Sequence, residues 1–262
     1  MTSGDTGVDS GPHRLETVRA ALERSLRSGK LADLKLAFEK DGVLVVEGEV
    51  AGIAAKKRAL RIAAITSGAG GLIDRLHVRP ATPMEDGEIR VHLAELFALD
   101  PRFTDIALFE DRSARPVGVK HDYSAVAGAS SETGGRLTIA VRDGVVTLDG
   151  AVPSLVRMRL AGAIAWGAPG VRDVVNGLTV RPPEEDGPDQ LEEAVREALD
   201  GHPLFDDAQV KVGAFGDSVR LTGLVHSDDA RDAAEETAWR ILGVDEVINE
   251  IEVAPSGQRS SS

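Results

Sequence analysis

The chain has 262 residues, of which 42% are apolar, and its formal net charge is −13. It contains no cysteine, which excludes disulfide bonds and thiolate metal sites. No apolar run approaches the roughly 18 residues of a membrane span, and the first ten residues lack the basic and apolar segments of a signal peptide. We therefore expect a globular protein in the cytoplasm, able to act peripherally at the inner face of the membrane.

Residues 1–13 are rich in Gly, Ser and Asp and predict a disordered tail. From Arg14 to Pro80 the pattern predicts a helix, a strand, a tight turn at Asp41-Gly42, a second strand, a helix and a third strand. The two helices are expected at 14–29 and 53–66, and the three strands at 34–38, 43–50 and 72–78. A strand-helix-strand crossover makes its two strands parallel, while the hairpin is antiparallel. The unit is therefore expected to be a three-stranded mixed sheet with both helices on one face, and the other face open to a neighbour or solvent.

The same αββαβ order recurs twice further along the chain. Residues 84–181 repeat it with a long insertion at about 104–135, and residues 182–188 form a Pro-rich linker. Residues 189–254 give the third copy, and residues 255–262 a second disordered tail. Most of the insertion is expected to be a surface loop, with residues 105–109 as a possible extra edge strand.

Glycines at fixed positions carry the repetition. Gly48, Gly150 and Gly223 each close the second strand of a unit, and another glycine stands twenty residues after each of them. These second glycines are Gly68, Gly170 and Gly243. Agreement without a gap through a helix indicates one supersecondary unit present three times. The predicted fold is α+β, built from three tandem αββαβ units.

The middle copy also carries a family resemblance. Segment 144–152, Gly-Val-Val-Thr-Leu-Asp-Gly-Ala-Val, is followed by a helix and then by segment 170–176, Gly-Val-Arg-Asp-Val-Val-Asn. This arrangement closely resembles the BON domain of bacterial osmotically induced and outer-membrane-maintenance proteins. Three such domains would cover nearly all of the chain except the tails and the insertion.

The resemblance implies a non-enzymatic binding or scaffold protein without a cofactor. It would attach to anionic phospholipid surfaces or to protein partners in a stress response. A cytoplasmic potassium-binding protein also contains this domain, so an ion or small-ligand sensor is one alternative, although the peptidoglycan-type module of that protein is absent here. An enzyme with its site in the insertion is the other alternative.

Charge is distributed unevenly among the copies. Residues 14–80 hold 13 Lys or Arg against 8 Asp or Glu, the middle unit holds 11 against 13, and residues 183–253 hold 5 against 20. The basic first copy and the acidic third copy are expected to attract each other, within one chain or between copies. Light scattering across a salt series would test that expectation.

The basic end includes four cationic residues on one predicted helix, Lys56, Lys57, Arg58 and Arg61. They are candidates for binding phospholipid headgroups, nucleic-acid phosphate or an acidic partner, and a solvated helix face is the alternative. Nucleic acid is the weakest of these partners because the whole chain is acidic.

Catalytic and metal-binding patterns are weak. The run Gly68 to Gly71 lacks the spacing of a dinucleotide loop and the lysine and serine of a phosphate loop, so a turn is the better interpretation. His121-Asp122-Tyr123 lies in the insertion without a second histidine motif, and His202, Asp206 and Asp207 flank a helix end and a loop. The acidic third copy also lacks the ligand spacing of a calcium loop. The sequence therefore predicts no catalytic residue, metal site or cofactor.

Overall fold

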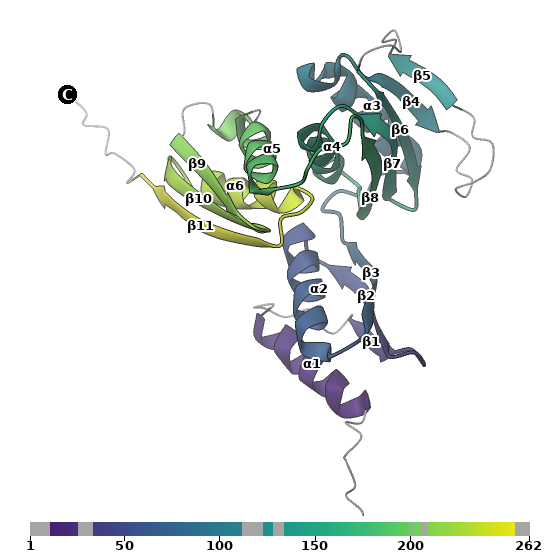
Figure 1. Ribbon diagram of the computed structural model, residues 1–262, viewed down its shortest axis with the longest axis vertical. Coiled ribbons are helices and arrows are strands. Elements are labelled where there is room, and N and C mark those ends of the chain that lie inside the picture. The colour runs from purple at the N-terminus through teal and green to yellow at the C-terminus, as the bar shows by residue number, and fades with distance from the viewer. Residues whose placement is uncertain are drawn as a thin grey trace, which may run out of the picture. The chain divides into compact units, whose positions relative to one another are not determined.

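The structure is a computed structural model that describes residues 11–25, 34–111, 123–127, 134–200, 202–205 and 209–254. The chain divides into two compact units, Met1–Arg79 and Pro80–Ser262 (Figure 1). The first unit contains one αββαβ repeat, called repeat 1, and the second contains repeats 2 and 3. Helices and mixed sheets build both units, so the predicted α+β class is confirmed.

Repeat 1 follows the predicted element order. Its elements are α1 (Gly11–Ser25), β1 (Lys35–Phe38), β2 (Val43–Val50), α2 (Ile53–Ser67) and β3 (Gly71–Val78). Strand β2 is central, antiparallel to β1 and parallel to β3. Both helices cover the same face, because residues of α1 and α2 share one buried cluster with the inner side of β2. Helix α1 begins three residues before the predicted start at Arg14.

Repeat 2 has a wider sheet than predicted. Its elements are α3 (Asp86–Leu99), a short 3-10 helix (Pro101–Phe103), β4 (Ala107–Asp111), β5 (Tyr123–Ala127), β6 (Arg136–Arg142), β7 (Val145–Val152), α4 (Leu155–Gly167) and β8 (Asp173–Val180). The sheet order is β5-β4-β6-β7-β8.

The prediction of a three-stranded sheet beside a long surface loop is therefore wrong for repeat 2. The alternative of an extra strand at residues 105–109 is confirmed in part by β4, which lies two residues later and inside the sheet instead of at its edge. Strand β4 pairs in parallel with β6, and β5 pairs antiparallel with β4. Ala107 and Leu108 are buried in β4, which gives this part of the insertion enough apolar surface to extend the sheet. Residues 112–122 and 128–133 of the insertion, which include His121 and Asp122, lie outside the described residues, as do residues 1–10 and 255–262 of the predicted tails. Residues 11–13, predicted to belong to the first tail, are helical instead.

Repeat 3 is three-stranded, as expected. Its elements are α5 (Pro188–Asp200), a short 3-10 helix (Pro203–Phe205), β9 (Gln209–Phe215), β10 (Ser218–Val225), α6 (Asp228–Arg240) and β11 (Glu246–Val253), with sheet order β11-β10-β9. Pro188, predicted to end the linker, instead opens α5, where its missing N–H costs no helical hydrogen bond.

The parallel strand pairs have the same register in every repeat. Gly48 lies opposite Leu76, Gly150 opposite Leu178 and Gly223 opposite Ile251, a separation of 28 residues each time. The three glycines have φ angles of 142°, 129° and 138°. They stand inside their strands rather than at the ends as predicted. Gly68, Gly170 and Gly243 follow the second helix of each repeat, also with positive φ.

In the second unit, repeats 2 and 3 pack through their helices. Helix α4 contacts both α5 and α6 (Figure 1). Of the two alternatives expected for the open sheet faces, a neighbour or solvent, a neighbour is not what these helix contacts provide within this unit. Helix α4 covers its own sheet and also contacts the helices of repeat 3, and residues such as Leu160, Ala161 and Ala165 are buried in it.

Candidate functional site

Lys56 does not belong to the predicted basic surface. Its side chain is only 5% exposed, and its Nζ lies 3.0 Å from Asp74 Oδ2. The same ammonium donates a 2.7 Å hydrogen bond to the carbonyl oxygen of Leu76. Grouping Lys56 with Lys57, Arg58 and Arg61 as one basic surface was therefore wrong, because this residue links α2 to β3 inside repeat 1.

The Lys56–Asp74 pair has counterparts at the equivalent positions of repeats 2 and 3. Counting from the strand glycine, Met158 and Arg231 correspond to Lys56, while Asn176 and Asn249 correspond to Asp74. Each asparagine donates from Nδ2 to the carbonyl oxygen of its partner position, at 2.8 Å in repeat 2 and 3.2 Å in repeat 3. A carboxylate has no hydrogen to donate, so in repeat 1 the direction is reversed: the lysine Nζ is the hydrogen-bond donor, and its acceptors are Asp74 and the carbonyl oxygen of Leu76.

The remaining predicted cations do lie toward solvent. Arg58 and Arg61 are exposed and Lys57 is half-buried. Ile65 is 73% exposed and follows Arg61 by four residues, so it lies on the same side of α2. We call Lys57, Arg58, Arg61 and Ile65 the basic stripe. Helix α2 contains no acidic residue, so the stripe combines positive charge with one exposed apolar side chain.

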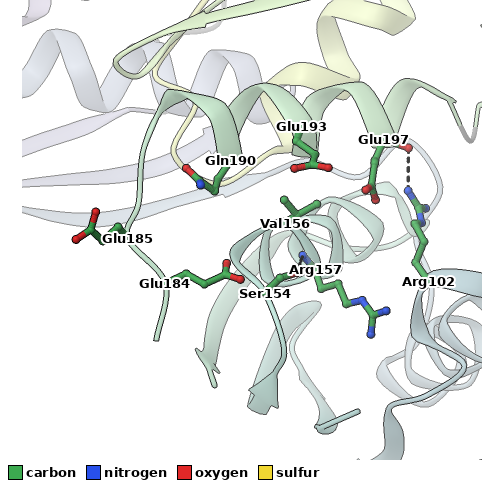
Figure 2. A pocket seen from close by; sticks show the side chains of 9 residues that line it. All are labelled: Arg102, Ser154, Val156, Arg157, Glu184, Glu185, Gln190, Glu193 and Glu197. Atoms are coloured by element: carbon green, nitrogen blue, oxygen red, sulfur yellow. Dashed lines mark hydrogen bonds between the residues drawn. The ribbon is translucent and has the colours of Figure 1, made fainter. Parts of the chain in front are cut away.

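The second unit contains an open cavity of about 540 Å³ between repeats 2 and 3. Figure 2 shows its lining, which comes from the start of α4, the 3-10 helix after α3, the linker and α5. The lining residues are Arg102, Ser154, Val156, Arg157, Glu184, Glu185, Gln190, Glu193 and Glu197. Glu184 accepts a hydrogen bond from the N–H of Leu155, and Arg102 donates to the carbonyl oxygen of Glu197.

Both arginines of this cavity are bound to carboxylates outside it. Arg102 Nη2 lies 2.6 Å from Asp100 Oδ2, and Arg157 Nη1 lies 2.7 Å from Asp105 Oδ1. Burial raises the pKa of Asp100, but the hydrogen bonds and charge of Arg102 outweigh burial and hold that pKa below its usual value. The four glutamates thus dominate the electrostatic potential, which makes the cavity unsuitable for a phosphate group.

The Asp105–Arg157 pair gives a direct pH prediction. The hydrogen bond from Arg157 lowers the pKa of Asp105 from its ordinary 3.8. The pair therefore contributes stability above that value, and the contribution is lost as pH falls through the lower folded pKa. In an Arg157→Gln variant the pKa of Asp105 is expected to rise toward 3.8, measured by carboxyl-carbon NMR titration, while that of Asp100 stays unchanged. An unchanged Asp105 would show that the two side chains do not pair in solution.

The other candidates from the sequence either take part in turns and local hydrogen bonds or lie outside the described part of the chain. Gly68 ends α2 in the left-handed conformation and Gly71 begins β3, so this run is a turn. Burial and the charge of Arg240 lower the pKa of His202, whose Nδ1 accepts a hydrogen bond from the N–H of Leu204. Asp206 and Asp207 are not among the described residues.

The described residues contain neither a cluster of metal ligands nor a membrane-spanning helix. None of their His, Asp or Glu side chains gather in a group of three or more that could hold a metal ion. Among the helices in the same ranges, none is long and apolar enough to cross a membrane.

Comparison with protein families identifies the class of domain. Residues 124–182 and 188–255 match the family model of the BON domain. Two consecutive segments of the chain therefore match the BON domain, one in repeat 2 and one in repeat 3. BON domains are non-catalytic binding domains, and the two matches support a general binding role.

Comparison with curated proteins gives no match. Among solved structures, the chain is similar to the C-terminal domain of CdsD, a structural protein of the type III secretion system of Chlamydia trachomatis, with 14% identity and a TM-score of 0.23 over 92% of this chain and 97% of that chain. A second CdsD structure gives 13% identity and a TM-score of 0.24 over 92% of each chain. These TM-scores are too low to carry a conclusion about fold or function.

Proposed function

We propose that this chain is a non-enzymatic attachment protein whose first repeat binds the surface of an anionic phospholipid membrane. The observation that carries the proposal is the basic stripe on α2, where Arg58 and Arg61 are exposed beside Ile65. A cationic side chain near an anionic membrane contributes about 1 kcal/mol to binding. An apolar side chain on the same helix face can enter the boundary between headgroups and acyl chains.

The distribution of charge favours repeat 1 over the BON domains as the attachment site. Repeat 1 has an excess of cations, whereas residues 183–253 hold 20 acidic residues against 5 basic ones. An anionic membrane would repel that acidic repeat. The inner face of a cytoplasmic membrane is the surface we propose, because that leaflet is rich in anionic lipids. Repeats 2 and 3 then remain available to protein partners.

We further propose that repeat 1 is a third, divergent BON domain. It lies outside the matched segments, yet its parallel strands pair with the same 28-residue separation as β7 with β8 and β10 with β11. Its glycines Gly48 and Gly68 also have positive φ, as their counterparts do in the matched repeats. The Asp74–Lys56 pair replaces the asparagine of those repeats, which is one reason for the divergence in sequence.

Vesicle co-sedimentation of the full chain tests the attachment site. Vesicles of phosphatidylcholine with and without phosphatidylglycerol are compared at low and physiological salt. Changing Lys57, Arg58 and Arg61 to Gln is expected to weaken binding by about 3 kcal/mol in total, roughly a hundredfold, because each charge contributes about 1 kcal/mol. Ile65→Ala is expected to cost about 1 kcal/mol at both salt concentrations, because apolar burial is not screened.

A control variant of repeat 3 removes the same number of positive charges as the basic-stripe variant. Changing Arg196, Arg220 and Arg231 to Gln removes three arginines of repeat 3, each paired with a neighbouring carboxylate. Binding of this variant should stay within about twofold of the native chain. Full binding by the basic-stripe variant, or equal loss in the control, would reject attachment through α2.

A further inference from the structure

Arg159 of α4 lies at the contact between repeats 2 and 3. Its side chain is only 5% exposed, although the residue is an arginine. Its Nε donates a 3.0 Å hydrogen bond to the carbonyl oxygen of Leu242 in repeat 3, and its Nη2 lies 2.6 Å from Asp186 Oδ1 in the linker. One guanidinium therefore joins the helix of repeat 2, the linker and the segment that follows α6.

The carbonyl that Arg159 reaches has a counterpart in repeat 1. Leu242 stands immediately before Gly243, and Ser67 stands immediately before Gly68. In repeat 1 the Ser67 carbonyl accepts a 2.8 Å hydrogen bond from Nε of Arg14. Arg14 belongs to α1 of the same repeat, so here the arginine comes from within the repeat.

The glycines make room for these guanidinium groups. A Cβ atom added at Gly68 would lie 3.4 Å from Arg14 Nη2, and one added at Gly243 would lie 3.3 Å from Arg159 Nη2. In repeat 2 the space beside Gly170 is filled by Met84 and Ile89 instead. Each repeat thus has a small space beside the glycine that follows its second helix, Gly68, Gly170 or Gly243. We call this space the glycine socket.

The helix that fills the socket of repeat 1 cannot do the same in repeat 3. Helix α5 has an acidic first turn and contains one basic residue, Arg196, which pairs with Glu193. Lys57 and Asp232 occupy the positions equivalent to Arg159 in the other repeats, counted from the strand glycine. Arginine at this position is therefore specific to repeat 2, the repeat that has repeat 3 as its packed neighbour.

We propose that the glycine socket of repeat 3 is a guanidinium-binding site, and that Arg159 occupies it to hold the two BON domains as one rigid body. The carbonyl of Leu242, two residues beyond the end of α6, supplies the acceptor. Asp186 supplies the opposing carboxylate, which offsets the cost of burying the cation. The cavity between repeats 2 and 3 then has a fixed shape, because its walls belong to both repeats.

Distance measurements between spin labels on repeats 2 and 3 test whether Arg159 holds the two repeats rigidly. The chain has no cysteine, so Val175→Cys in β8 and Lys211→Cys in β9 introduce the only two labelling sites, both exposed. The native background is expected to give one narrow distance distribution. Arg159→Ala is expected to broaden it at least twofold. Arg159→Lys, which carries the residue type of repeat 1 at this position, should fold and also broaden the distribution, because an ammonium lacks the planar fork that spans both acceptors.

Arg157→Ala is the matched control, since Arg157 lies on the same helix but pairs with Asp105 inside repeat 2. Its distribution should remain narrow. A narrow distribution in Arg159→Lys would overturn the proposal, and so would equal broadening in Arg157→Ala. Far-UV circular dichroism of each variant confirms that the repeats are folded before the distances are compared. Membrane binding is not involved, so failure here leaves the proposed function of repeat 1 unaffected.

Discussion

Gly150→Ala is expected to destabilise the second unit by about 3 kcal/mol or more, because the added methyl group meets both an unfavourable backbone conformation and a neighbouring strand. Gly150 has a φ of 129°, a conformation that a residue with a Cβ rarely adopts. An added Cβ would also lie 2.1 Å from the carbonyl oxygen of Arg136 on the neighbouring strand. Relief requires β6 and β7 to separate, which breaks ladder hydrogen bonds. Urea denaturation followed by circular dichroism measures the loss.

Gly213→Ala provides the matched comparison. Gly213 also lies in a strand of the second unit, β9, but a Cβ added there meets no atom within 4 Å and its φ is not in the left-handed region. The same methyl group is therefore expected to change stability by about 0.5 kcal/mol at most. Similar losses in the two variants would show that the backbone of Gly150 relaxes without strain.

Lys56→Ala is expected to lower the free energy of unfolding of repeat 1 by about 2 kcal/mol. The variant removes the donor to the Leu76 carbonyl and the counter-ion of Asp74. The Asp74 side chain is 34% exposed, so water partly replaces the lost ammonium, and the expected cost stays below that of a fully buried pair.

A double variant separates the ion pair from the packing of the lysine chain. Lys56→Met with Asp74→Asn installs the residue types that repeat 2 has at Met158 and Asn176, where the asparagine donates directly to the helix carbonyl. Its stability is expected to recover to within about 1 kcal/mol of the native chain, whereas Lys56→Met alone should not recover. The cycle consists of the native chain, Lys56→Met, Asp74→Asn and the double variant, and thermal and urea unfolding measure the stability of each. Additive losses would show that the two positions do not act as a pair.

The repeat architecture was predictable because its signals are local. Asp143-Gly144 forms a two-residue turn with φ angles of 51° and 74°, and such a turn fixes the register of the hairpin that contains it. The constant spacing from strand glycine to helix-end glycine then extends that register through the crossover. These features depend on residues within about 30 positions of one another, which a sequence pattern can reveal.

Strand β4 was predicted only as an alternative, an edge strand at residues 105–109, and strand β5 was not predicted. Strand β4 gains its stability by pairing in parallel with β6, beyond a segment whose Gly and Ser content is typical of a loop. The contact of Arg159 with Leu242 spans 83 residues and leaves no periodic signal. Interactions of this kind depend on which surfaces meet in the folded chain.

The position of Lys56 could have been predicted from helical periodicity. Consecutive helical residues are separated by about 100° around the axis, so Lys56, Lys57 and Arg58 cannot all lie on one face. Lys56 shares its face with Ile53, Ala59 and Ala63, which are all buried. The apolar neighbours three and seven residues away indicated burial, whereas the run of three cations indicated a surface.

The two extra strands of repeat 2 also determine which sheet edges can accept another chain. Strands β1 and β9 are the outermost strands of their sheets, whereas the corresponding strand of repeat 2, β6, is covered by β4 and β5. An uncovered strand presents unpaired backbone groups on which a foreign strand can assemble. Strand addition directly on β6 is therefore blocked in repeat 2, where β5 is the outermost strand on this side. Repeats 1 and 3 rely on other protection, the short length of β1, which has four residues, and the exposed Lys211 in β9.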